Sequence, residues 1–167
     1  MSATQHKTQA PRAVRCYVLT VSDTRTADTD TSGRAIRALL EEAGHVVVGH
    51  DIVRDEPSDV TAHVVAQLGD GPTEVIITTG GTGITSRDDT FEAIDAVLEK
   101  RLTGFGELFR MLSFAEIGSA AMMSRATAGT VGRRAVFVLP GSEAAVRLAM
   151  TQLIVPELGH VAQQLAR

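Results

Sequence analysis

The stretch Glu74–Asp89, EVIITTGGTGITSRDD, sets the fold class of this 167-residue chain. Its first six residues, EVIITT, form a short and almost wholly apolar run, which predicts a strand buried on both faces of a parallel sheet. The following residues, Gly80–Asp89, predict a loop that leads into a helix with apolar residues at helical spacing from Phe91 to Leu98. The stretch is therefore one strand–loop–helix unit of an alternating fold.

The same alternation continues on both sides of this unit. Apolar and β-branched runs predict strands at 14–21, 46–53 and 134–139, and helices are predicted between them. Thr31 or Ser32 is expected to cap the first helix, and Pro156 is expected to break the last helical region. Because alternating strands and helices favour right-handed crossovers, the predicted fold class is α/β. It has three layers, with helices on both faces of a mostly parallel sheet.

A single α/β domain is expected over residues 13–167, because this length corresponds to about one domain. Residues 1–12 are polar and lack periodicity, which predicts a disordered tail. A mainly helical insertion is expected from 104 to about 123, and the segment that begins at Ser124-Arg125 is expected to reach the same end of the sheet as the loops.

The insertion is rich in large apolar side chains. Four of them have helical spacing and are predicted to be core residues: Phe105, Leu108, Phe109 and Leu112. Glu107 and Arg110, three residues apart, are predicted to form an exposed ion pair. Further apolar residues exceed what one small element needs for its own core, namely Met111, Phe114, Met122 and Met123. This excess is a weak indication of an interface between subunits.

Composition excludes several classes of protein. The chain has 16 basic and 20 acidic residues, and this net charge of −4 argues against a nucleic-acid partner held through its phosphates. Cys16 is the only cysteine, which excludes an internal disulfide and a cysteine-based zinc site. Neither lysine, Lys7 or Lys100, follows a glycine as a P-loop requires. There is no apolar run near the ~18 residues of a membrane span and no secretion signal, so a cytoplasmic protein without a membrane partner is expected.

Small, hydroxyl and carboxylate residues follow the ends of four predicted strands. Ser22 and Asp23 follow the first strand, and Asp55 follows the second. The third strand ends at Thr79, and the last is followed by Pro140. Because ligands of parallel sheets bind beyond the carboxyl ends of the strands, we expect the functional site at this edge.

The glycine loop after the third strand consists of Gly80, Gly81, Thr82 and Gly83. Glycines let the backbone approach a ligand closely, and successive N–H groups can form an anion-binding nest. The alternative is a tight turn without a ligand. A dinucleotide fingerprint is not favoured, because Ser86 occupies the position of its third glycine.

The turn Pro140-Gly141-Ser142 places a helix N-terminus directly after the last strand. Free N–H groups and the helix dipole attract phosphate at such a position. The alternative is that Ser142 is an ordinary N-cap.

Two aspartates, Asp55 and Asp88, lie just past strand ends, with Asp23 and Asp89 nearby. Mg²⁺ usually binds one or two carboxylates together with substrate phosphates, so a converging pair would suit this ion. The alternative is that Asp55, Asp88 or Asp89 caps a following helix.

Several motifs in order along the chain resemble the MoaB/MogA family of molybdenum cofactor biosynthesis proteins. They are Ser22-Asp23-Thr24-Arg25, Asp30-Thr31-Ser32-Gly33, Thr79-Gly80-Gly81-Thr82-Gly83, Arg87-Asp88 with Thr90, Gly104-Phe105-Gly106-Glu107, Ser124-Arg125-Ala126 and Leu139-Pro140-Gly141-Ser142. The resemblance runs from about Val14 to Glu157. The stretch GFGELFRMLSFAEIG and the Pro-Gly-Ser turn resemble the MoaB branch more than the MogA branch.

The resemblance implies a Rossmann-like protein that forms homotrimers, or often homohexamers in the MoaB branch, and that binds molybdopterin, a pterin with a dithiolene and a terminal phosphate. It implies an adenylyltransferase that uses Mg²⁺ and ATP to adenylylate this phosphate and releases pyrophosphate. Other molybdenum cofactor enzymes are implied as partners.

The resemblance also assigns roles to individual residues. Pterin and phosphate would bind to the glycine loop and the proline turn with their neighbours, namely Ser22, Asp23, Thr79, Gly80, Gly81, Thr82, Gly83, Pro140, Gly141 and Ser142. Asp55 and Asp88 would be the catalytic pair and the magnesium ligands, and the Arg-Asp-x-Thr register favours Asp88 over Asp89.

Two other functions fit the sequence. One is a non-catalytic molybdopterin-binding or scaffold protein of the same pathway, which would bind the pterin without magnesium-dependent cleavage of ATP. The other is a domain of similar fold in another nucleotide pathway, which would bind nucleotide without pterin.

Overall fold

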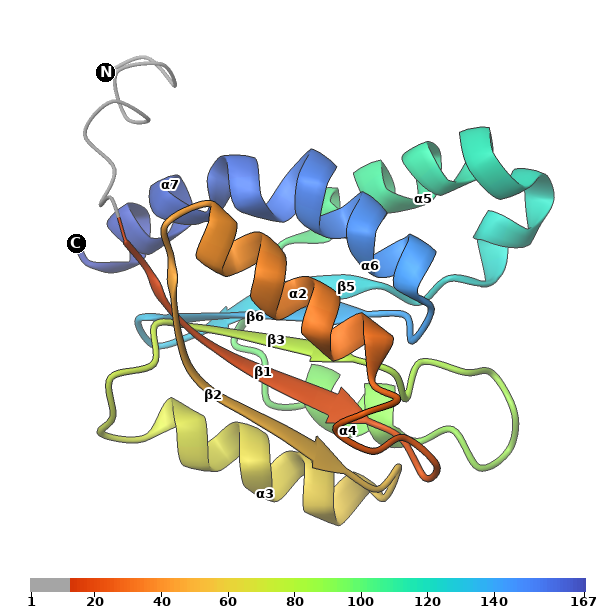
Figure 1. Cartoon of the computed structure of the whole chain (residues 1–167), viewed down its shortest axis with the longest axis horizontal. Helices are drawn as coiled ribbons and strands as arrows, with labels where there is room; N and C mark the ends of the chain where they lie inside the picture. Colours follow the sequence, from red (N-terminus) through yellow and green to blue (C-terminus); the bar gives the residue numbers. More distant parts are fainter. Residues whose placement is uncertain (1–12) are drawn as a thin grey trace.

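The computed structural model describes residues 13–167, which form the three predicted layers (Figure 1). The tail expected over residues 1–12 lies outside the described residues. Within residues 13–167, no helix is both long enough and apolar enough to pass through a bilayer.

Six strands form one sheet, in the order β2-β1-β3-β6-β5-β4. Their bounds are β1 Arg15–Val21, β2 Val46–Val53, β3 Val75–Thr79, β4 Lys100–Arg101, β5 Thr127–Val131 and β6 Arg134–Leu139. The first four strands in that order are parallel, as predicted. The strands β5 and β4 were not predicted, and they extend the sheet with antiparallel pairing. The carboxyl ends of β1, β2, β3 and β6 therefore meet at one edge.

Helices cover both faces of the sheet (Figure 1). Their bounds are α2 Thr31–Glu42, α3 Pro57–Leu68, α4 Thr90–Asp95, α5 Thr103–Ile117, α6 Glu143–Ala149 and α7 Val155–Leu165. The period-2 alternation of β1 divides the core in two. Cys16 and Val18 pack in the cluster that includes α2, α5, α6 and α7, whereas Tyr17 and Leu19 pack in the cluster that includes α3 and α4.

Two helix ends differ from the prediction. Asp30, not Thr31 or Ser32, caps α2, because its carboxylate accepts a hydrogen bond from the Gly33 N–H at 2.8 Å. Pro156 does not break the last helical region, since a π-helical turn, Met150–Ile154, joins α6 to α7 and leaves the proline in the first turn of α7. Because the hydrogen bonds of a π-helix run to the fifth residue, this turn accommodates the proline, which has no backbone N–H to donate.

The helix α5 is only half buried. Phe105 and Phe109 are core residues, as predicted, but Leu108 is 47% exposed, so its prediction as core was wrong. The expected Glu107–Arg110 ion pair is not what holds Arg110, whose guanidinium donates to the carbonyls of Ser124 and Ala126 at 3.3 and 3.2 Å. This arginine therefore ties α5 to the segment that enters β5.

The imidazole of His45 links the start of β2 to the start of β1. Its Nδ1 accepts a hydrogen bond from the Val14 N–H at 3.2 Å, which requires the neutral ring. Burial lowers the pKa of His45 below its ordinary value of 6.5. The unfolded chain then binds more protons than the folded one just below pH 6.5, so this contribution to stability is present above pH 6.5 and is lost as the pH falls.

We therefore expect the urea midpoint of the wild-type protein to fall between pH 7.5 and 5.5 by more than that of His45→Gln. Glutamine keeps an acceptor for the Val14 N–H but does not titrate. Urea unfolding followed by circular dichroism at both pH values measures the difference. Equal falls in the two proteins would show that His45 does not control stability in this range.

Candidate functional site

Three loops meet at the carboxyl edge of the sheet. Ser32 Oγ, in the first turn of α2, donates to the Gly141 carbonyl after β6 at 2.7 Å. Thr79 Oγ1, at the end of β3, donates to the Pro140 carbonyl at 2.9 Å. The three loops surround a hollow of about 210 Å³, which is lined by Thr20, Val21, Ser22, Arg25, Asp30, Ser32, Thr79 and Gly141. The ends of β1, β3 and β6 thus contribute to one site, as the sequence predicted for their loops.

Gly80 and Gly81 give the β3 loop its path. Their φ angles are +94° and +69°, in the left-handed region that favours glycine. A Cβ on Gly80 would also lie 2.2 Å from the Val21 carbonyl oxygen at the end of β1. The loop is therefore a tight turn that packs against the end of β1.

Ser142 is the N-cap of α6, where its Oγ accepts a hydrogen bond from the Ala145 N–H at 3.3 Å. The predicted alternative, an ordinary N-cap serine, is thus what the local geometry shows.

The loop after β1 is shaped by Ser22 and Asp23. Ser22 Oγ accepts hydrogen bonds from the N–H groups of Thr24 and Arg25 at 3.2 and 3.1 Å. Asp23 accepts one from the Asp55 N–H at 3.1 Å, which ties the β1 loop to the end of β2. These two predicted binding residues therefore position the loop that rims the hollow.

Asp55 and Asp88 are brought to the same corner of the edge. Asp55 Oδ1 accepts a hydrogen bond at 2.6 Å from Thr90 Oγ1, and Thr90 lies two residues after Asp88 in the chain. Asp88 Oδ2 accepts one from the Thr85 N–H at 2.6 Å. The helix-cap alternatives for Asp55 and Asp88 were wrong, because the N-caps of α3 and α4 are Glu56 and Asp89. Asp89 does occupy the N-cap position of α4, but its side chain makes no cap hydrogen bond.

The carboxylate of Asp88 is held in its charged form. Hydrogen bonding from Thr85 lowers the pKa of Asp88 below its usual value, and the nearby cations Arg125 and Arg87 lower it further. Hydrogen bonds to the ionised form stabilise it. Asp88 is therefore an anion throughout the neutral range.

Arg125 holds the glycine loop from the other side. Its guanidinium donates to the carbonyls of Thr82 and Gly83 and to that of Asp88, and it forms an ion pair with Glu92. It also lies over the Phe91 ring, 4.6 Å from the centroid. The segment from Ser124 therefore reaches the site, as predicted, although the sequence did not identify Arg125 as a site residue.

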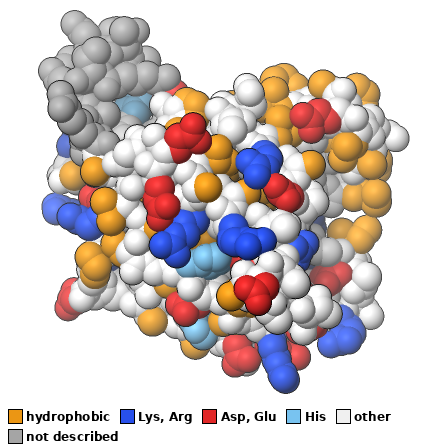
Figure 2. Space-filling model, in the orientation of Figure 1, with side chains coloured by type: hydrophobic (Ala, Val, Ile, Leu, Met, Phe, Trp, Pro, Cys, Tyr) orange, Lys and Arg blue, Asp and Glu red, His pale blue; other side chains and the backbone are white. Residues whose placement is uncertain are grey.

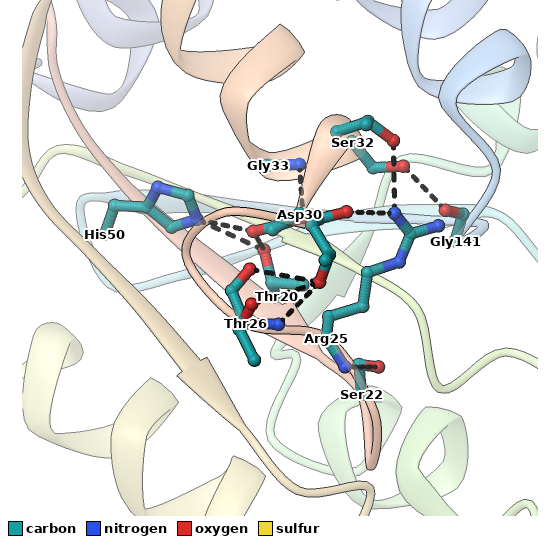
Figure 3. Close-up of polar contacts among 11 residues, drawn as sticks. Thr20, Ser22, Arg25, Thr26, Asp30, Ser32, Gly33, His50 and Gly141 are labelled. Carbon is teal, nitrogen blue, oxygen red and sulfur yellow. Dashed lines mark hydrogen bonds and ion pairs between the residues drawn. The ribbon is translucent and has the colours of Figure 1, made fainter.

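A buried polar cluster lies behind the hollow (Figure 3). Asp30, whose side chain is 1% exposed, accepts hydrogen bonds from Thr20 Oγ1 at 2.6 Å and faces His50 Nε2 at 3.0 Å. Thr20, His50 and the Gly33 N–H thus surround the Asp30 carboxylate. Sequence reasoning missed Thr20, Asp30 and His50 as a group, because the sequence shows Asp30 only as one of several polar residues in the loop after β1.

Comparisons with known proteins agree with this architecture. Residues 17–160 match a family model described as a probable molybdopterin binding domain. Molybdenum cofactor biosynthesis protein B of Bacillus cereus is 54% identical over 168 residues, which span 100% of this chain and 99% of that protein. The Bacillus subtilis protein of the same name is 52% identical over the same shares.

Solved structures match as well. A crystal structure of molybdenum cofactor biosynthesis protein B has a TM-score of 0.92 at 54% identity and covers 95% of this chain and 99% of its own. The tungsten cofactor synthesizing protein MoaB from Pyrococcus furiosus has a TM-score of 0.83 at 36% identity, covering 95% and 100%. A MogA structure has a TM-score of 0.82 at 30% identity, covering 90% and 99%. The chain therefore belongs to the MoaB/MogA family of molybdenum cofactor biosynthesis proteins and carries that family's molybdopterin-binding domain.

Proposed function

We propose that this chain adenylylates the terminal phosphate of molybdopterin with ATP and Mg²⁺ and releases pyrophosphate. The observation that carries the proposal is the placement of two aspartates, Asp55 and Asp88, on loops that meet beside the glycine turn at the carboxyl edge. Transfer of a nucleotidyl group needs positioning and charge neutralisation more than covalent chemistry from the protein. The carboxyl edge of the sheet has residues for positioning a substrate and carboxylates for binding a neutralising metal ion.

The donor set fits Mg²⁺ that arrives on nucleotide phosphates. Within residues 13–167, no group of three or more His, Cys, Asp or Glu residues could hold a metal ion by itself. Each aspartate has one oxygen in a hydrogen bond, Asp55 with Thr90 and Asp88 with Thr85, which leaves its second oxygen available as a ligand. Mg²⁺ commonly binds one or two carboxylates and completes its shell with phosphates and water. When bound, the ion would neutralise the charge that develops on the phosphates.

The residues around the hollow would orient the pterin phosphate. An oxygen of that phosphate attacks the α-phosphorus of ATP, a new phosphorus–oxygen bond forms, and the bond to the β-phosphate breaks to give pyrophosphate. The glycine loop, Gly80–Gly83, and the turn at Gly141 would hold the phosphate through backbone N–H groups. The Arg125 contacts to the carbonyls of Thr82 and Gly83 would keep this loop in place.

The direct test is incubation of the purified protein with molybdopterin, ATP and Mg²⁺. We expect pyrophosphate and an adenylylated pterin, and neither product when either substrate is left out. Bound pterin without product would instead establish the non-catalytic function in the same pathway. Nucleotide binding without pterin binding would assign the chain to another nucleotide pathway.

The exposed face of α5 supports a homo-oligomer, either a trimer or a hexamer. Large apolar side chains share this face and the 3-10 helix that follows, Gly118–Met123 (upper right in Figure 2). They are Leu108, Met111, Phe114, Ile117, Met122 and Met123, with exposed fractions between 47% and 82%. A contiguous apolar patch on a water-soluble chain marks a protein interface.

We expect Phe114→Glu to dissociate the oligomer into monomers at micromolar concentration, because Phe114 is 63% exposed on this face and a buried charge would oppose assembly. Light scattering after size exclusion measures the mass. The matched control is Ala66→Glu, which adds the same charge on the exposed side of α3. A wild-type protein that is already monomeric would contradict the proposed oligomer.

A further inference from the structure

A second hollow lies between α2 and the edge strand β2, on the other side of the buried Asp30 cluster from the candidate site. Its volume is about 490 Å³, within the usual range for small-ligand sites. The lining residues are Ala27, Arg34, Arg37, Ala38, Glu41, His50 and Ile52. Figure 2 shows basic side chains beside a histidine on this face of the molecule.

The charges of this hollow do not cancel. Arg37 forms an ion pair with Glu41 at 2.9 Å, and Glu41 is the only acid of the lining. Arg34 makes no ion pair or side-chain hydrogen bond with any residue of the described part of the chain. One guanidinium therefore faces the hollow without a counter-charge, beside the apolar wall of Ala27, Ala38 and Ile52.

His50 connects the hollow to the candidate site. Its side chain is 12% exposed, and its Nε2 faces Asp30 at 3.0 Å and Thr20 at 3.2 Å (Figure 3). Its Nδ1 points away from these partners and has no hydrogen-bond partner within residues 13–167. A carboxylate that accepts from Nε2 leaves Nδ1 as the nitrogen that gains or loses the proton. In the charged ring, Nδ1 is a donor.

From these contacts we infer that the hollow binds a small phosphate-bearing molecule whose remaining part is apolar. Arg34 and the protonated Nδ1 of His50 donate to the phosphate oxygens, and the wall at Ala27, Ala38 and Ile52 covers the apolar part. Asp30 and Thr20, which contact His50, also line the candidate site, so the two hollows share these residues.

The charged groups that face His50 decide which form of the ring a bound anion favours. Asp30 and the bound anion favour the imidazolium, whereas Arg34 and Arg37 oppose it, and Glu41 is engaged by Arg37. Asp51, the next residue of β2, accepts from Tyr17 Oη on the opposite face. Neutralisation of Arg34 by a bound anion removes the repulsion, so a bound anion favours the charged ring.

Inorganic sulfate is the probe, because it is a tetrahedral dianion whose charge does not change between pH 6 and 8. We expect sulfate to move the His50 ring signal saturably in carbon–proton NMR spectra. His50→Gln identifies that signal. Arg34→Gln should weaken the effect roughly tenfold, the loss expected for one charge-assisted contact. The matched control, Lys100→Gln, removes a cation at the other edge of the sheet and should have no effect.

The variants also separate this hollow from the candidate site. Arg34 is exposed on the solvent side of α2, so Arg34→Gln is expected to fold normally, and sulfate-dependent shifts at the Gly81 and Ser142 amides should persist in it. A His50 signal that does not move with sulfate would overturn the inference. So would a His50 shift that is equal in wild type and Arg34→Gln, since it would then be transmitted from the candidate site.

Discussion

Asp88→Asn is expected to lower the rate of pyrophosphate release by about 10²- to 10³-fold, the usual loss when one preorganised electrostatic group is removed from a phosphoryl-transfer site. Asparagine can still accept the hydrogen bond from the Thr85 N–H, so the loop should keep its shape. What disappears is the negative charge that Thr85 and the neighbouring arginines stabilise. Molybdopterin binding, measured by fluorescence titration, should therefore be largely retained.

The neighbouring carboxylate supplies the control. Asp89 is the N-cap of α4 but makes no side-chain cap bond, so Asp89→Asn should leave the rate and the folding almost unchanged. Equal losses of rate in the two variants would show that the negative charge at the start of α4 matters, whichever of the two aspartates carries it. Loss of pterin binding together with turnover in Asp88→Asn would show that Asp88 shapes the loop and does not act on the nucleotide.

Gly33→Ala should destabilise the protein by about 3 kcal/mol, at the upper end of the cost of overpacking a core. A Cβ on Gly33 would lie 2.2 Å from Asp30 Oδ2, 2.5 Å from His50 Nε2 and 2.5 Å from Thr20 Oγ1. A rotamer change of one side chain would not relieve these contacts, because the three atoms are joined by hydrogen bonds. The melting temperature should fall by roughly 10 °C for a chain of this length.

Gly104→Ala is the matched substitution, in the first turn of α5 as Gly33 is in the first turn of α2. A Cβ on Gly104 would meet nothing within 4 Å. Alanine is the better helix former, so this variant should be as stable as wild type or slightly more stable. Similar melting temperatures for the two variants, measured by differential scanning calorimetry, would refute the crowding at Gly33.

Much of the fold could be predicted from local patterns. β3 is a run of five β-branched residues, VIITT, all of them buried, which is typical of a strand covered by helices on both faces. The strand β5, TAGTV, could not be predicted, because its small residues lack an apolar pattern and it forms a strand by pairing with β6. The exposure of one apolar face of α5 could not be predicted either. Helical spacing shows which residues share a face, but it does not show which face the sheet covers.

The candidate site divides in the same way. Glycines, hydroxyls and aspartates after the strands were enough to locate the edge, because parallel strands bring their carboxyl ends together. Asp55 is separated from Thr90 by 35 residues, and Arg125 from Gly83 by 42, so no local pattern reveals these contacts. The cap of α2 was misassigned to Thr31 or Ser32 for a related reason, since the choice of Asp30 depends on burial beside Thr20 and His50.

The sequence by itself determined the α/β class, the parallel strands, the edge of the sheet where the loops of the candidate site meet, and the family. These follow from hydrophobic periodicity and from residue types in order along the chain, which are properties of short segments. Only the tertiary structure decided which carboxylates are free to bind a metal, which arginines are already paired and which glycines are crowded. Those outcomes depend on atoms that the chain brings together from distant positions, where burial sets the cost of an unpaired charge or a misplaced methyl group.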